Sequence, residues 1–195
     1  MDLGSWGRIA GADEAGRGPL AGPVVAAAAI LTPDQEEDLL SHGLADSKKL
    51  TPAKRELIYR RITDLGVCRA AQAASPARID RMNILQASLW AMTMSVKKLP
   101  PIYDTVVADG NFALPGLDCR SVAMQRADAL LPAAAAASVI AKVLRDRVMV
   151  ILDGLYPGYG FIRHKGYPTA AHRAAMAELG PSPVHRRSFS WRPPR

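Results

Sequence analysis

The sequence contains very little cysteine. Cys68 and Cys119 are the only two cysteines among its 195 residues, which gives neither a disulfide framework nor a zinc knuckle. We expect both to be small buried side chains. This cysteine usage suits a reducing compartment, and we predict a cytoplasmic protein.

The sequence also lacks a long apolar run. Its first nine residues include Asp2 and do not resemble a secretory signal. The apolar run at 24–31 is far too short to cross a bilayer, so we expect no membrane contact. No internal repeat or domain boundary is visible. The length fits one domain, which we expect to span 1–195 with a basic, proline-rich tail from about residue 185.

Acidic residues are outnumbered by basic ones. There are 25 Lys and Arg against 18 Asp and Glu, which gives a net charge of +7 and a pI of about 9.7. Such a protein can bind polyanions by releasing their counterions, although a basic soluble surface would give the same balance. Hydrophobic residues make up 49% of the chain, which excludes global disorder.

Strand and helix signals alternate along the chain. Short apolar runs predict strands at 9–13, 24–31, 67–74, 105–108 and 120–124, and apolar periodicity predicts helices at 52–65, 76–99, 133–152 and 169–179. We therefore predict an α/β fold with a mixed central sheet of about five strands flanked by helices, followed by a C-terminal helical segment.

Four carboxylates lie in unusual positions. Asp13 and Glu14 follow an apolar strand, Asp109 ends another, and Asp128 precedes an alanine-rich helix. A carboxylate near an apolar core is costly unless something compensates its charge, and a cation could do so. Oxygen ligands without His or Cys suit Mg²⁺ or Mn²⁺. Capping or solvation could explain each acid singly, as solvation does for the cluster at 36–38, so convergence remains a prediction.

The adjacent acids Asp13 and Glu14 carry a structural implication. Neighbouring residues on a strand point to opposite faces. If both acids hold metal, we expect the chain to bend or bulge there, which Gly16 and Gly18 would allow.

Several motifs, in order over residues 9–189, closely resemble the ribonuclease HII family. They read GADEAGRGPLAGPVVAAAAIL, LADSKKLTPAKRELIYRRI, VVADGN, RADALLPAAAAASVIAKVLRDRVM, YPGYGFIRHKGYPTAAH and HRRSF. The resemblance implies a ribonuclease H-like fold. It also implies an endonuclease that hydrolyses the RNA strand of RNA–DNA hybrids and cuts 5′ of ribonucleotides embedded in DNA. Two divalent ions, Mg²⁺ or Mn²⁺, would assist, and the products would be a 3′-hydroxyl and a 5′-phosphate.

The resemblance also assigns residues. It makes Asp13, Glu14, Asp109 and Asp128 the catalytic, metal-binding carboxylates. It makes Gly16, Arg17 and Gly18 a backbone reader of 2′-hydroxyls, and Tyr167 a ring that packs on the next deoxyribose. Ser47, Lys48 and Lys49 resemble a phosphate-contacting loop. From the residues alone, a tight turn, a half-buried tyrosine and a solvated loop are the respective alternatives.

Further residues are weaker candidates. His164 and Lys165 could lie near the substrate, and Arg186 and Arg187 could reach phosphates, although His164 could equally be a structural hydrogen-bonding residue. Arg126-Ala127 stands before Asp128 where the family often has Lys-Gly, which keeps the charge but loses the freedom of glycine.

Three functions remain to be distinguished. The first is the endonuclease, acting as a monomer, without the N-terminal domain of ribonuclease HIII or a clamp-binding tail. The second is a non-catalytic hybrid-binding protein of the same fold, which would not need four acids facing a polyanion. The third is another two-metal nuclease or phosphatase, which would cut plain DNA as well.

Overall fold

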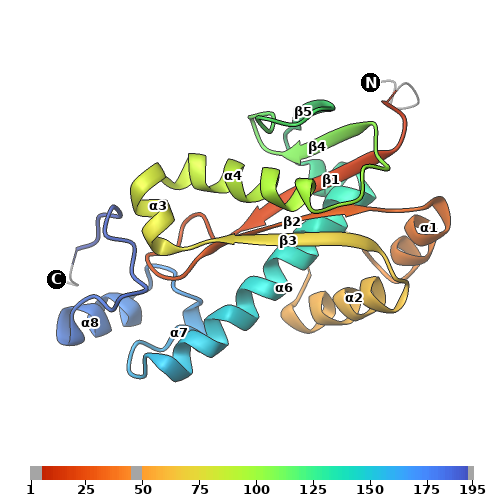
Figure 1. Cartoon of the computed structure of the whole chain (residues 1–195). Helices are drawn as coiled ribbons and strands as arrows, with labels where there is room; N and C mark the ends of the chain where they lie inside the picture. Colours follow the sequence, from red (N-terminus) through yellow and green to blue (C-terminus); the bar gives the residue numbers. More distant parts are fainter. Residues whose placement is uncertain (1–5, 45–49, 193–195) are drawn as a thin grey trace.

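A computed structural model of the chain describes residues 6–44 and 50–192 (Figure 1). One five-stranded sheet lies at its centre, with the strand order β3-β2-β1-β4-β5. Pairing is antiparallel for β1 with β2 and β2 with β3, and parallel for β1 with β4 and β4 with β5. The predicted mixed sheet is confirmed. The strands are β1 (Ile9–Ala15), β2 (Val24–Ile30), β3 (Cys68–Ala74), β4 (Thr105–Asp109) and β5 (Arg120–Met124).

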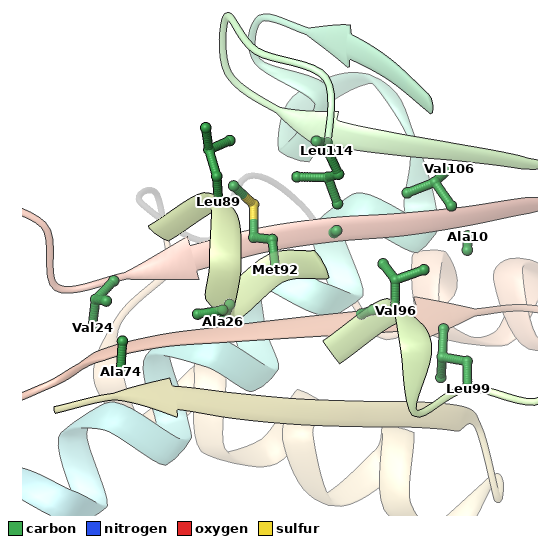
Figure 2. Packing of buried hydrophobic residues seen from close by; sticks show 14 of the residues in the cluster. Ala10, Val24, Ala26, Ala74, Leu89, Met92, Val96, Leu99, Val106 and Leu114 are labelled. Carbon is green, nitrogen blue, oxygen red and sulfur yellow. The ribbon is translucent and has the colours of Figure 1, made fainter. Parts of the chain in front are cut away.

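Helices cover both faces of this sheet. One apolar cluster joins α4 to one face, and a second joins α1, α2 and α6 to the other (Figure 1). Figure 2 shows Leu89, Met92 and Val96 of α4 lying over the strands that carry Ala10, Ala26 and Val106. The helices are α1 (Pro33–Ser41), α2 (Pro52–Asp64), α3 (Pro76–Met82), α4 (Ile84–Lys97), α5 (Ala127–Leu130), α6 (Pro132–Leu155), α7 (Phe161–His164) and α8 (Ala170–Leu179).

Small residues let α6 lie very close to the sheet. All five alanines at 133–137 are buried, as are the four at 26–29 of β2. A Cβ on Gly11 of β1 would overlap the backbone of Ala133 and Ala134, so only glycine fits where the helix crosses the strand. A strand covered on both faces needs apolar residues throughout, which explains the unbroken run in β2.

The predicted helix at 76–99 is wrong in one respect, because it is two helices. Asn83 has φ 67° and ψ 165°, which no helical residue adopts, and it separates α3 from α4. The Asn83 side chain accepts a hydrogen bond from the Gln86 amide (3.0 Å) and so caps α4. Ser75 caps α3 in the same way, through the Arg78 amide.

The acidic cluster at 36–38 lies on α1, whose start is fixed by a capping box. Thr32 accepts a hydrogen bond from the Gln35 amide, and the Gln35 side chain accepts one from the Thr32 amide. The other end of the chain forms the expected helical segment: α7, α8 and the residues after them pack around Phe161 and Met176. Within 6–44 and 50–192, no helix is both long enough and apolar enough to cross a bilayer.

Candidate active site

Three of the four predicted carboxylates converge at one edge of the sheet. Each of Asp13, Asp109 and Asp128 offers an oxygen within 4.8 Å of the other two. The register explains two of them: Ala12 of β1 pairs with Ala108 of the parallel strand β4, so the residues that follow lie side by side. Asp13 is 4% exposed and Asp128 is 2% exposed, so this cluster is largely shielded from water.

A tight turn after β5 brings Asp128 to the cluster. Arg126 has φ 60° and ψ 34°, a left-handed conformation, and α5 begins at the next residue. The Ala127 amide donates a hydrogen bond to Oδ1 of Asp109 (2.8 Å), which ties this turn to the end of β4. The left-handed residue is Arg126, not Ala127. Replacing the family's glycine by Ala127 therefore leaves the turn intact.

Glu14 lies beside the cluster but is not part of it. The expected bend between Asp13 and Glu14 is absent, since β1 pairs with β2 without a skipped residue as far as Ala15. The side chain of Glu14 is 10% exposed and lies 3.5 Å from Arg17. Its Oε2 atom is buried and has no hydrogen-bond partner among the described residues. A buried carboxylate oxygen of this kind is ready to receive a cation or a donor.

The acids shift one another's protonation. Burial, followed by the charge of Glu14, raises the pKa of Asp13 to about 7. Burial also raises the pKa of Glu14, against the lowering effect of Arg17, and the charge of Asp109 adds to the rise. Crowded, desolvated carboxylates resist ionisation until a positive charge joins them.

Two residues of α6 that face Asp13 were not among the predicted site residues. Ser138 is fully buried and donates a hydrogen bond to Asp13, and Lys142 Nζ donates one to the Ser138 hydroxyl (2.9 Å). The hydrogen bond from Ser138 and the charge of Lys142 both lower the pKa of Asp13. Ser138, Lys142 and Arg145 recur at i, i+4 and i+7 in a mostly apolar helix, and this polar stripe was the available signal.

These side chains fit a divalent cation. Every donor is a carboxylate oxygen, three of them gather within 4.8 Å, and Glu14 adds a buried oxygen without a partner. Hard cations such as Mg²⁺ and Mn²⁺ prefer this donor set, and neither needs a histidine or cysteine ligand. Asp13, Asp109 and Asp128, with Glu14 beside them, could therefore hold metal.

A groove of about 480 Å³ is lined by Glu14, the residue after Asp13, and by Lys142. It brings the predicted Tyr167 next to Gly16, Arg17 and Gly18, which lie far from it in the sequence. Its cationic lining suits a polyanion. The basic residues of the groove are Arg17, Arg55, Lys142, Arg145, Arg163 and Lys165.

Two buried arginines shape the backbone at 16–23. Arg186 donates hydrogen bonds to the carbonyls of Gly16 (2.6 Å), Arg17 (2.8 Å) and Gly22 (3.0 Å). Arg145 donates to the carbonyls of Pro23 (3.1 Å), Ala21 and Lys165. Gly16 has φ 95°, and a Cβ there would overlap the Arg145 guanidinium, so this position requires glycine.

Arg186 thus differs from its expected role. Arg186 is 2% exposed, and its N–H groups donate hydrogen bonds to main-chain carbonyls. It therefore supports the loop and does not reach phosphates. Burial, followed by the charge of Arg145, lowers its pKa to about 9. Arg187 is held through its main chain, because its amide donates to Asp80 (3.0 Å).

Tyr167 lies at the groove with its ring accessible. Its side chain is 47% exposed, and its Cε1 atom lies 3.8 Å from where a Cβ on Gly18 would be. The Arg145 guanidinium lies 5.8 Å from the ring centroid. The open ring and the glycine loop therefore form one continuous surface.

The remaining predicted residues divide into three groups. Lys165 lines the groove. His164 has a structural role, since its Nε2 donates to the Tyr159 carbonyl (2.8 Å) and its Nδ1 accepts from the Gly166 amide (3.2 Å). The predicted phosphate loop of Ser47, Lys48 and Lys49 lies outside the described residues.

Known proteins resemble this chain in both sequence and fold. The sequence model of the ribonuclease HII family matches residues 10–191. A ribonuclease HII from Azorhizobium caulinodans is 51% identical over 186 residues, which cover 93% of this chain and 68% of that protein. One from Polaromonas sp. strain JS666 is 50% identical over 189 residues, which cover 95% and 92%.

Solved structures agree with the sequence match. The ribonuclease H2 of Pyrococcus horikoshii superposes with a TM-score of 0.76 at 28% identity, covering 93% of both chains. The Archaeoglobus fulgidus ribonuclease HII, solved in complex with PCNA, gives a TM-score of 0.73 at 26% identity over 92% of both. A Bst ribonuclease HIII solved with Mn²⁺ shares the fold at 22% identity and a TM-score of 0.69, covering 89% of this chain and 63% of that one.

The matched model covers nearly the whole chain, and the relatives are about half identical over most of it. The ribonuclease H-like fold that the motifs implied is therefore confirmed. This chain belongs to the ribonuclease HII family.

Proposed function

We propose that this endoribonuclease cuts the RNA strand of RNA–DNA hybrids and also cuts 5′ of single ribonucleotides embedded in duplex DNA, with two divalent ions held by Asp13, Glu14, Asp109 and Asp128. Family membership carries the coarser statement, that the chain is a ribonuclease H that acts on hybrids. The observation that supports the finer one is the convergence of Asp13, Asp109 and Asp128 beside a basic groove.

Hydrolysis would join a water oxygen to phosphorus and break the bond to the 3′ oxygen, giving a 3′-hydroxyl and a 5′-phosphate. Two bound divalent ions would activate the water and stabilise the leaving oxygen. Ser138 and Lys142 favour the ionised form of Asp13, which is the form that binds a cation. The Ala127 amide holds the Asp109 carboxylate at the end of β4.

Recognition of the strand would fall to the groove. The Gly16–Gly18 backbone, held from behind by Arg145 and Arg186, can approach a 2′-hydroxyl closely. The exposed ring of Tyr167 offers a flat apolar face to a deoxyribose, and a 2′-hydroxyl would lose its hydration there. Exposed cations such as Arg163 would contact phosphates, which position the duplex without reading its sequence.

A non-catalytic hybrid-binding protein is the less favoured function. Acids gathered beside the groove repel phosphate unless a cation joins them. The raised pKa values of Asp13 and Glu14 show that burial also disfavours their ionised forms. A protein that only bound duplexes would gain nothing from this arrangement.

A nicking assay tests the proposal. A duplex with one embedded ribonucleotide, a uniform RNA–DNA hybrid and an all-DNA duplex are incubated with Mg²⁺ or Mn²⁺. We expect cleavage on the 5′ side of the ribonucleotide, cleavage of the hybrid, and no cleavage of plain DNA. Equal cleavage of the DNA duplex would indicate a different nuclease, and binding without cleavage would indicate the hybrid-binding protein.

Variants link the activity to the carboxylates. Asp109→Asn should lower the rate by at least about 100-fold, because metal assistance is worth several kcal/mol. Asp118→Asn is the matched control, since Asp118 is an exposed aspartate outside the cluster. An Asp109→Asn protein as active as the control would remove the metal assignment.

A further inference from the structure

Three histidines form a largely buried cluster next to the groove. His164, His172 and His185 surround Phe161, and the His164 and His172 rings stack with centroids 4.4 Å apart. His172 is 0% exposed and His185 is 4% exposed. Their Nε2 atoms lie 3.0 Å apart, so a direct hydrogen bond joins two buried imidazoles.

The surrounding donors fix the direction of this bond. The Ser182 amide donates to Nδ1 of His185 (2.9 Å), so that nitrogen carries no proton. A neutral His185 is then protonated on Nε2 and donates to Nε2 of His172. His172 must in turn carry its proton on Nδ1, which donates to the main-chain carbonyl of Tyr167 (2.9 Å).

Both imidazoles are held neutral. Burial, followed by the charge of His172, lowers the pKa of His185 to about 4, and burial lowers the pKa of His172. The charge of His164 lowers both pKa values further. The residue after His185 in the chain is the basic Arg186. A proton added to the pair would place two N–H groups face to face and break the bond.

One end of this chain of hydrogen bonds is Tyr167, which lines the groove, and the other end is His185, whose segment contacts the chain that follows the glycine loop. Tyr167 contributes the exposed ring. His185 belongs to a segment that is paired with the glycine loop: Ala21 and His185 form a β-bridge, and the Arg186 amide donates to the Leu20 carbonyl (2.8 Å). The Arg186 side chain then holds the carbonyls of Gly16 and Arg17.

We propose that His172 and His185 are positioning residues for Tyr167: their hydrogen-bonded pair fixes the tyrosine against the Gly16–Gly18 loop and so sets the preference for the RNA-to-DNA junction. This inference rests on the proposed role of Tyr167 in that preference. Neither histidine lines the groove or belongs to the carboxylate cluster, and His172 contacts Tyr167 through that residue's main-chain carbonyl.

The protonation pattern is tested in the unaltered protein. Long-range ¹H–¹⁵N spectra at neutral pH distinguish the two imidazole tautomers. We expect His185 with its proton on Nε2 and His172 with its proton on Nδ1. A proton on Nε2 of His172, or a charged ring at either position, would overturn the proposed chain whatever the activity.

The selectivity is tested by a double-mutant cycle on the ratio of kcat/KM for the single-ribonucleotide duplex to that for the uniform hybrid. His172→Phe keeps a ring of similar size but loses both nitrogens. We expect it to lower this ratio by about tenfold, the equivalent of one buried hydrogen bond. In the Tyr167→Ala background it should lower the ratio no further. A His172→Phe ratio equal to the wild-type ratio, or a further fall in the double variant, would overturn the inference.

Two more proteins complete the design. His172→Asn keeps a donor near the Nδ1 position and should retain most of the ratio; a ratio as low as that of His172→Phe would count against the hydrogen bond to Tyr167. His42→Phe removes an exposed histidine at the end of α1, outside the histidine cluster and the groove, and should leave the ratio unchanged. If Tyr167→Ala itself keeps the wild-type ratio, the proposed role of Tyr167 fails; if it lowers the ratio and His172→Phe does not, only this inference fails.

Discussion

Gly11 of β1 lies directly against the backbone of Ala134 in α6, with no room for a Cβ between them. This contact sets how closely α6 approaches the sheet, and α6 carries Ser138 to Asp13. We predict that Gly11→Val destabilises the protein by about 1–3 kcal/mol, the usual cost of overpacking. Urea unfolding measures the change.

Gly154→Ala is the matched control for that substitution. Gly154 lies in α6, the helix that Gly11 contacts, and a Cβ on Gly154 would meet no atom within 4 Å. This variant should be neutral or more stable by about 0.5–1 kcal/mol, because alanine is the better helix former. Equal destabilisation by both variants would contradict the close-packing explanation.

The raised pKa of Asp13 predicts a pH-dependent stability in the absence of metal. The folded protein keeps the Asp13 proton up to about pH 7, whereas the unfolded chain releases it near 3.8. The stabilising contribution is therefore complete below about pH 4 and is lost as the pH rises to about 7. In the presence of a chelator, the unfolding free energy of Asp13→Asn should therefore rise relative to that of the wild type by roughly 2–4 kcal/mol from about pH 5 to about pH 8.

Urea unfolding of wild type and Asp13→Asn at both pH values gives this difference. Asp118→Asn, which alters an exposed acid, should follow the wild type at each pH. Parallel curves for wild type and Asp13→Asn would show that Asp13 is not protonated in the folded, metal-free protein.

Tyr167 should govern selectivity and contribute little to stability. Because its side chain is 47% exposed, Tyr167→Ala should cost less than about 1 kcal/mol of unfolding free energy. Cleavage of the single-ribonucleotide duplex should fall much more than cleavage of the hybrid, and Tyr167→Phe, which keeps the ring, should stay close to wild type. A uniform loss on every substrate would contradict a selective role.

The groove cations and the buried arginine should differ in their salt dependence. Arg163 is exposed and lines the groove, whereas Arg186 is buried and bound to carbonyls. In a non-cleaving Asp109→Asn background, Arg163→Gln should reduce the slope of log affinity against log salt by about 1. Arg186→Lys should leave the slope unchanged; a similar reduction would mean that Arg186 contacts phosphate after all.

Much of the fold follows from local pattern. The five strands are short apolar runs. Thr51 caps the start of α2, and Thr169 caps the start of α8. The break at Asn83 was not visible, because the apolar stripe of Ile79, Leu85 and Leu89 continues across it. A single residue with positive φ ends α3 and starts α4 without leaving a gap in hydrophobicity.

The site was predictable where strands end and less so where tertiary contacts decide. Asp109 ends a strand that lies parallel to β1, so strand order alone brings it to Asp13. Ser138 and Arg186 depend on contacts across 125 and 170 residues respectively. A basic residue in a basic tail suggests a phosphate contact. Only the folded chain shows that Arg186 donates its hydrogen bonds to main-chain carbonyls of the loop at 16–22.

Metal binding at the carboxylates tests the central claim most directly. Crystals soaked in Mn²⁺ and measured at its absorption edge locate the ion by anomalous scattering, independently of catalysis. We predict a strong peak in contact with Asp13, Asp109 and Asp128 that is lost in Asp109→Asn and kept in Asp118→Asn. Mn²⁺ absent from these three side chains, or bound equally well after Asp109→Asn, would contradict the account.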